Sequence, residues 1–105
     1  MKYIDSEETI VALSTPAGRG AIAVIRISGV DSLSIINQLS KRQLKAGDHR
    51  MAVRSEIRSR DGSRLLDDCV LTYFRSPNSY TGEDVVEISC HCNHIIIEQI
   101  IREVL

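Results

Sequence analysis

Apolar residues recur along the chain with two different spacings, and these spacings predict where strands and helices lie. A nearly continuous apolar run, residues 21–27, is typical of a strand that is covered on both faces. Residues 51–59 alternate instead, with Met51, Val53 and Ile57 on one side, which predicts a strand with one solvated face. Three further strands are predicted at residues 8–14, 65–74 and 84–91.

Two segments carry apolar residues at helical spacing. Asp31 is a candidate N-cap for a helix that ends near Ser40, and Asn93 is a candidate N-cap for a second helix. The apolar stripe of the first helix comprises Leu33, Ile36 and Leu39, and that of the second comprises Ile96, Ile97, Ile100, Ile101, Val104 and Leu105. The second stripe reaches the last residue without a C-cap signal, so we expect the chain to be a piece of a longer protein.

Glycine and proline mark the connections between these elements. Asp61-Gly62 is a strong hairpin signal, because both residue types tolerate a positive φ. The loop Pro16–Gly20 lacks the Lys-Ser/Thr pair of a phosphate-binding loop and precedes a strand, so we interpret it as a tight turn. Strands and helices segregated in this order predict an α+β fold, with a mixed five-stranded sheet and two to three helices, in one domain over residues 1–105.

Composition restricts the possible functions. The formal net charge is −1, and the chain has one Phe, three Tyr and no Trp, so we do not expect it to grip RNA by itself. The basic connector, with Lys41, Arg42, Lys45, His49 and Arg50, is interpreted as a solvated surface. Three cysteines without an export signal indicate reduced thiols and a cytoplasmic protein, and no apolar run is long enough for a membrane span.

Two charged residues stand inside apolar strands. Arg26 lies within the run 21–27 and Glu87 within the run 84–91. A buried lone charge is very costly, so each of these side chains needs a partner. Either the two side chains pair with each other or lie at strand ends in water, or both line a pocket for a ligand with complementary polar groups.

The segment around Cys90, Cys92 and His94 invites a zinc hypothesis, but its spacing argues against one. On an extended strand the two cysteines lie about 6.7 Å apart. Two thiolates on one zinc ion lie less than about 4 Å apart. Cys69, inside a predicted strand, is most simply a small buried apolar residue.

Two longer motifs resemble a known family. They are TIVALSTPAGRGAIAVIRISG, residues 9–29, and SPNSYTGEDVVEISCH, residues 76–91. Together they resemble the N-terminal domain of the MnmE (TrmE) family of bacterial tRNA modification GTPases. The resemblance runs from about Glu8 to the end of the chain.

The resemblance implies a fold similar to the tetrahydrofolate-binding domain of aminomethyltransferases, and a domain that binds 5-formyl- or 5,10-methylene-tetrahydrofolate and forms a homodimer. The GTPase and helical domains, with GTP, Mg²⁺ and K⁺, lie outside this chain, which is not itself expected to be catalytic. The whole family member, a GTP hydrolase, works with the flavoprotein MnmG (GidA) in a heterotetramer. Together they install an aminomethyl-type group on C5 of the wobble uridine in tRNA.

Two folate-contacting positions of the family fall on Arg26 and Glu87, the two residues that the strand pattern had singled out. A carboxylate accepts two hydrogen bonds from an aminopyrimidine edge, and an arginine suits a carboxylate or carbonyl of the same ligand. The chain departs from the family where Cys92 and Asn93 replace two glycines after His91, which puts the local turn in question. A purely structural dimerisation module and a small Cys/His metal-binding protein are the alternatives.

Overall fold

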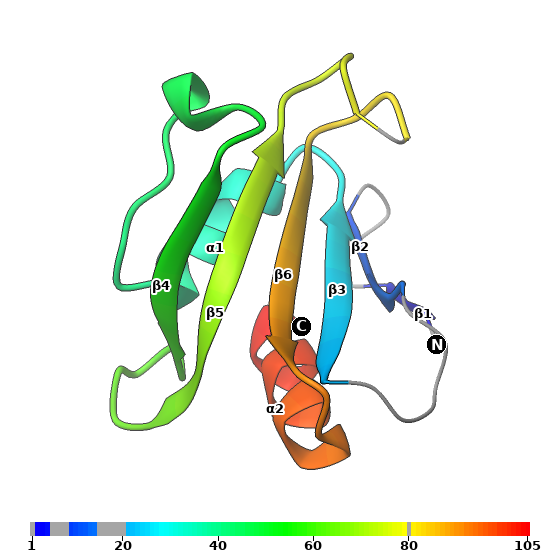
Figure 1. Cartoon of the computed structure of the whole chain (residues 1–105). Coiled ribbons are helices and arrows are strands. Elements are labelled where there is room, and N and C mark those ends of the chain that lie inside the picture. The colour runs from blue at the N-terminus through cyan, green and yellow to red at the C-terminus, as the bar shows by residue number, and fades with distance from the viewer. Residues whose placement is uncertain (1, 5–8, 15–20, 80) are drawn as a thin grey trace.

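The computed structural model describes residues 2–4, 9–14, 21–79 and 81–105. Their core element is a six-stranded sheet with the order β1-β2-β3-β6-β5-β4, in which all neighbouring strands are antiparallel (Figure 1). The strands are β1 (Lys2–Ile4), β2 (Ile10–Leu13), β3 (Ile22–Ser28), β4 (Ala52–Arg58), β5 (Leu65–Phe74) and β6 (Val85–His91). The helices are α1 (Ser32–Leu39), the short 3₁₀ helix η1 (Ala46–Asp48) and α2 (His94–Val104).

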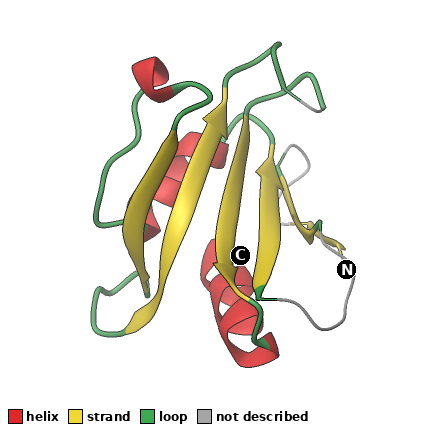
Figure 2. Cartoon of the chain, in the orientation of Figure 1, coloured by secondary structure: helices red, strands yellow, loops and turns green. Residues whose placement is uncertain are grey.

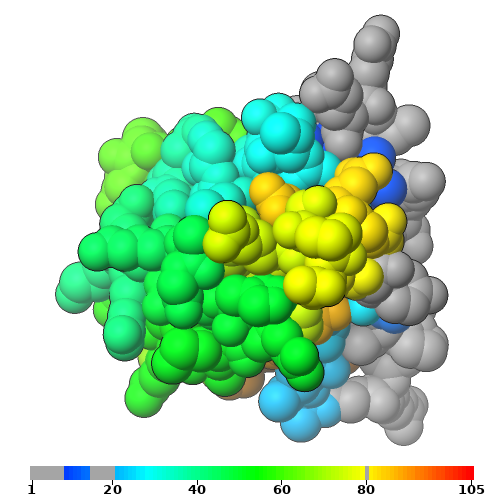
Figure 3. Space-filling view, turned by 90° about the horizontal axis from the view of Figure 1, so that it is seen from above, coloured from blue at the N-terminus to red at the C-terminus, as the bar shows by residue number. Residues whose placement is uncertain are grey.

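Both α-helices lie on the same face of the sheet, and the opposite face carries no helix among the described residues (Figure 2). We call the opposite face the bare face. Seen from above, the loop between β5 and β6, in yellow, lies beside the residues of α1 and of the connector that precedes β4 (Figure 3). The core therefore forms between the helices and one side of the sheet, and none of the described helices covers the other side.

The predicted α+β class and both predicted α-helices are confirmed. The structure adds β1, a short strand at the edge of the sheet that the sequence pattern did not indicate. The pairing is antiparallel throughout the strands, where a mixed sheet was expected. The α1 crossover carries the chain from β3 past two positions to the far edge of the sheet, where β4 runs antiparallel to β3, so this connection does not produce a parallel pair.

The core consists of branched aliphatic residues from the helices and from one side of each central strand. The completely buried side chains include Ile25, Ile27, Ile36, Ile57, Leu71, Ile88 and Ile100. The apolar stripe of α2 is confirmed at Ile100, Ile101 and Val104, whereas Leu105, beyond the end of the helix, is 44 % exposed. Met51 was expected on the buried side of its strand, but β4 begins after it and its side chain is 56 % exposed.

The two predicted N-caps differ. The Asn93 side chain accepts hydrogen bonds from the backbone N–H groups of Ile95 (2.9 Å) and Ile96 (3.2 Å), which satisfies two donors at the start of α2. Asp31 occupies the N-cap position of α1, but its side chain makes no capping hydrogen bond. Instead, the buried hydroxyl of Ser32 donates to the carbonyl of Gly29 (2.8 Å) and holds the strand-to-helix turn.

The Asp61-Gly62 hairpin signal is confirmed between β4 and β5. Gly62 has a φ of 77°, which a residue with a side chain rarely adopts. The Asp61 carboxylate accepts hydrogen bonds from the Ser59 hydroxyl (2.6 Å) and from the backbone N–H of Ser63 (2.9 Å). These bonds, led by the one from Ser59, lower the pKa of Asp61 to about 2.

Replacing Asn93 tests the cap of α2. Asn93→Ala removes the acceptor for two helix N–H groups, so we expect the free energy of unfolding to fall by about 1 kcal/mol. Urea unfolding followed by circular dichroism measures this difference. The control Asn93→Asp keeps an acceptor oxygen and is expected to retain the stability; an equal loss in both variants would contradict the capping role.

Lowering the pH tests the Asp61 turn. The folded pKa lies below the unfolded value of about 3.9, so the ionised carboxylate stabilises the fold above that pH, and this contribution is lost as the pH falls towards 2. Asp61→Asn keeps an acceptor but does not titrate. We expect the difference in unfolding free energy between wild type and variant to shrink between pH 4 and pH 2, measured by urea unfolding at each pH. A difference independent of pH would refute the assignment.

Candidate functional site

The two charged residues singled out in the sequence lie directly opposite each other at the centre of the sheet. Arg26 on β3 and Glu87 on β6 are partners in the strand register. Nη2 of Arg26 donates to Oε2 of Glu87 at 2.6 Å, and Nε donates to the same oxygen at 3.1 Å. Their side chains are 24 % and 25 % exposed, so the pair is half-buried but open to solvent on one side.

The pair lies on the bare face. The neighbours of each residue along its own strand, Ile25 and Ile27 on β3 and Ile88 on β6, are buried in the core, and strand alternation directs Arg26 and Glu87 to the other side. Each charge therefore has the partner that a partly buried charge requires, as the ion-pair interpretation expected. Ligand binding by these two residues stays a prediction.

Short side chains flank the ion pair in the neighbouring strands. Ala12 on β2 lies opposite Arg26, and Thr72 on β5 lies opposite Glu87. Both arginine contacts fall on Oε2 of Glu87, so Oε1 takes no part in them. The arrangement presents a guanidinium and a carboxylate on a floor of small residues, and such a pair is suited to a planar ligand with several N–H and C=O groups.

The loop between β5 and β6 is held to the end of the sheet by hydroxyl and carboxylate contacts. The Ser28 and Thr81 hydroxyl oxygens lie 2.8 Å apart, which joins the end of β3 to the loop before β6. The Asp84 carboxylate accepts a hydrogen bond from the backbone N–H of Ser76 at 2.8 Å. The predicted loop Pro16–Gly20 lies outside the described residues.

The Cys/His segment is not arranged as a metal centre. Cys69 and Cys90 are buried in the core, and burial raises the pKa of both thiols, that of Cys90 to about 11. Among the described residues no three His, Cys, Asp or Glu side chains come together in a way that could hold a metal ion.

The glycine replacements after β6 are accommodated without strain. Asn93 has a φ of −137° and serves as the N-cap of α2, and among the described non-glycine residues only Arg50 has a positive φ. The left-handed conformation that glycine would permit is therefore not used at Cys92 or Asn93. The turn departs from the expected family pattern in sequence but is a well-formed helix start.

Sequence reasoning did not identify the contact between Asp67 and His91. The backbone N–H of His91 donates to Oδ2 of Asp67 at 2.9 Å, and Nδ1 of the ring lies 2.8 Å from Oδ1. Burial by itself would raise the pKa of Asp67, but the hydrogen bonds from His91 and from the backbone N–H of Asp68 contribute to a net lowering of the pKa. Only the register of β5 against β6 brings these residues together, so no spacing in the sequence signals the contact.

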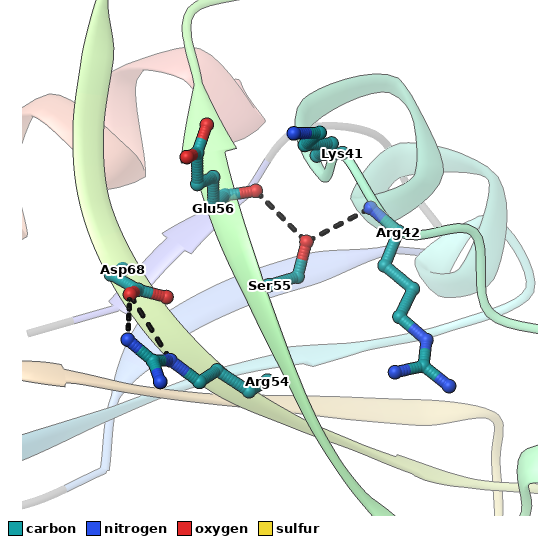
Figure 4. Close-up of a pocket in the computed structure, with 6 residues that line it drawn as sticks. All are labelled: Lys41, Arg42, Arg54, Ser55, Glu56 and Asp68. Atoms are coloured by element: carbon teal, nitrogen blue, oxygen red, sulfur yellow. Dashed lines mark hydrogen bonds and ion pairs between the residues drawn. The ribbon is translucent and has the colours of Figure 1, made fainter.

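A shallow hollow of about 600 Å³ lies between the basic connector and β4 (Figure 4). The connector is held against the strand, because the backbone N–H of Lys41 donates to the carbonyl of Glu56 (3.0 Å) and that of Arg42 donates to the Ser55 hydroxyl (2.9 Å). The lining residues are Lys41, Arg42, Arg54, Ser55, Glu56 and Asp68. Lys41 and Arg42 are exposed, as predicted for the basic connector, and their backbone is fixed against β4.

No helix in the described part of the chain has the length and apolar character that crossing a membrane requires. The chain is 45 % identical over 101 residues to the tRNA modification GTPase MnmE of Wolinella succinogenes, an alignment that covers 93 % of this chain and 21 % of that protein. It is also 45 % identical over 100 residues to the MnmE of Francisella philomiragia and 43 % identical to that of Francisella tularensis, with 95 % of this chain and 21 % of each relative covered.

The chain thus spans about a fifth of the length of the curated relatives that it matches. A family model described as "GTP-binding protein TrmE N-terminus" matches residues 9–105, a range that contains both strands of the ion pair. On this match and on the identity to its relatives, the chain belongs to the TrmE N-terminal family.

Proposed function

We propose that this chain is the folate-binding and dimerisation domain of a tRNA modification GTPase, and that Arg26 and Glu87 bind the ligand. The single observation that carries the proposal is the ion pair at the centre of the bare face, about a quarter exposed and flanked by short side chains. The proposed ligand is a 5-formyl- or 5,10-methylene-tetrahydrofolate. Membership of the TrmE N-terminal family supports the assignment.

The chemistry of the pair suits a pteridine. Oε1 of Glu87, which takes no part in the contacts with Arg26, accepts hydrogen bonds from the amino group and ring N–H of the pyrimidine edge. Arg26 fixes the orientation of that carboxylate through two donors on the other oxygen and offers its charge to a carbonyl or carboxylate of the ligand. The ion pair and the ligand site are thus two roles of the same side chains.

The other activities of the proposed protein belong to its remaining parts. GTP, with Mg²⁺ and K⁺, is bound and hydrolysed by a domain outside this chain, which covers about a fifth of its relatives. With the flavoprotein MnmG (GidA), in a heterotetramer, the whole protein installs an aminomethyl-type group on C5 of the wobble uridine in tRNA. In this proposal the folate domain binds the carrier of the one-carbon unit. Because the proposed substrate is tRNA, the proposed location of the protein is the cytoplasm.

Dimerisation through this domain is the second part of the proposal. The bare face carries apolar residues that this chain leaves uncovered: Ile22 on β3 is 62 % exposed and Val70 on β5 is 39 % exposed. We take these two exposed side chains as part of the proposed dimer surface. A dimerisation module without a ligand is the alternative function, and it predicts self-association without folate binding.

Folate titration with a charge-swapped variant tests the site. Glu87→Gln removes the charge that strengthens the hydrogen bonds to the pteridine, so we expect affinity for 5-formyl-tetrahydrofolate to fall roughly 10- to 100-fold. Arg26→Glu combined with Glu87→Arg rebuilds the ion pair with its ends exchanged. We expect this double variant to retain its fold but to lose folate binding, measured by isothermal titration calorimetry.

The charge-swapped variant is the matched control for stability, because it preserves the cross-strand attraction while it inverts the donor and acceptor groups. Circular dichroism and urea unfolding establish that it is folded. If it binds folate as tightly as the wild type, the pair has only a structural role and the site assignment is wrong. If the wild type gives no heat of binding with folate, the folate proposal is wrong and the alternative, a dimerisation module without a ligand, is favoured.

Light scattering tests dimerisation. We expect the wild-type chain to have the mass of a dimer and the variant Ile22→Glu with Val70→Glu to be a monomer, because like charges on the shared surface repel and are desolvated on association. Both substitutions are at exposed positions, so the core is untouched. A wild-type monomer at all concentrations, or an unchanged dimer in the variant, would place any self-association elsewhere.

A further inference from the structure

We propose that the hollow between the connector and β4 is a contact site for the phosphates of an RNA backbone. The inference rests on the proposed function in tRNA modification and names a surface through which this domain meets the nucleic acid. It differs from the expectation drawn from composition, because net charge counts the whole chain whereas phosphate contacts depend on where the cations gather.

The charges around the hollow leave two cations in excess. Asp68 is paired with Arg54, whose Nη2 lies 2.6 Å from Oδ2, and Glu56 is paired with Arg58, whose Nε lies 3.1 Å from Oε1. Each carboxylate on the wall thus has its own arginine. Lys41 and Arg42 are exposed and form no ion pair with the described residues.

The connector holds these cations on a fixed backbone. Besides the two hydrogen bonds to β4, the Asn37 side chain donates to the carbonyl of Leu44 (2.9 Å) and accepts from its N–H (2.8 Å). The Ser40 hydroxyl donates to the carbonyl of Arg42 at 2.8 Å. Only side chains need to be ordered on binding, which lowers the entropic cost of contacting a ligand.

The chemistry of the wall favours a sugar–phosphate backbone over a single nucleotide. The backbone N–H groups of Lys41 and Arg42 are already bonded to β4, so they offer no nest of amides for one phosphate group. Among the described residues, no aromatic side chain on which a base would stack lines the hollow. Spread-out side-chain cations without base contacts suit a chain of phosphates and bind it without sequence preference.

The hollow lies two strands away from the strand that carries Glu87 of the proposed folate site. Arg54 on β4 lies opposite Val70 on β5, and Val70 lies opposite Ser89 on β6, two residues from Glu87 on the same face of that strand. Two strand spacings amount to roughly 10 Å. The N–H of Arg42 is bonded to Ser55, whose buried side chain lies on the core side of β4. RNA held by Lys41 and Arg42 would therefore lie along the β4 edge of the sheet.

Fluorescence anisotropy with a labelled RNA stem-loop tests the proposal. We expect Lys41→Ala combined with Arg42→Ala to weaken binding roughly tenfold and to reduce the slope of log affinity against log salt by about 1 to 2, measured from about 50 to about 200 mM salt. The matched control is Arg64→Ala combined with Arg75→Ala, which removes the same charge from exposed positions outside the hollow. We expect the control to lose much less affinity.

The outcomes separate this inference from the folate assignment. Equal loss in both double variants, no RNA binding by the wild type, or equal binding of a poly-glutamate peptide would each overturn the hollow as an RNA contact. Folate titration of the same variants is independent, because neither pair contacts Arg26 or Glu87. Unchanged folate affinity with lost RNA affinity supports both proposals, and lost folate affinity in the hollow variant contradicts the separation of the two sites.

Discussion

The register of β3 against β6 is the constraint on which the rest of this structure depends. It aligns Arg26 with Glu87, so that each strand carries one charge and neither charge is left alone in a half-buried position. Because side chains alternate along a strand, a slip of one residue by either strand would turn its charge towards the core, leave the other charge without its partner and expose core residues of the strand that slipped. The ion pair and the hydrophobic core therefore specify the same register, and a different register would disrupt both.

Because both α-helices lie on one face of the sheet, the charged side chains that this register aligns lie on the other face. The core forms against α1 and α2, and the polar members of the central strands are left on the bare face. The proposed folate site lies at the centre of this face, and the proposed RNA contact lies along the β4 edge of the sheet. An antiparallel sheet with one covered face combines a rigid scaffold with an open surface, because its strands keep their hydrogen bonds without a second layer.

Much of the fold could be predicted because its signals are local. The alternation around Val53 and Ile57, the Asp61-Gly62 turn and the Asn93 cap each depend on residues close together in the chain, and each is confirmed. Local signals were misleading at Met51, where the strand begins one residue later and the side chain is exposed, and at Asp31, where Ser32 makes the bonds that hold the turn. In both places tertiary packing decided between local options of similar energy.

The sequence by itself determined that Arg26 and Glu87 need partners, because a charge among aliphatic neighbours is costly wherever its strand lies. Only the tertiary structure decided that they are partners of each other, that His91 meets Asp67, and that Lys41 and Arg42 form a wall beside β4. These contacts join residues far apart in the chain. Their existence depends on strand order and register, which are properties of the whole packed sheet and not of any one segment.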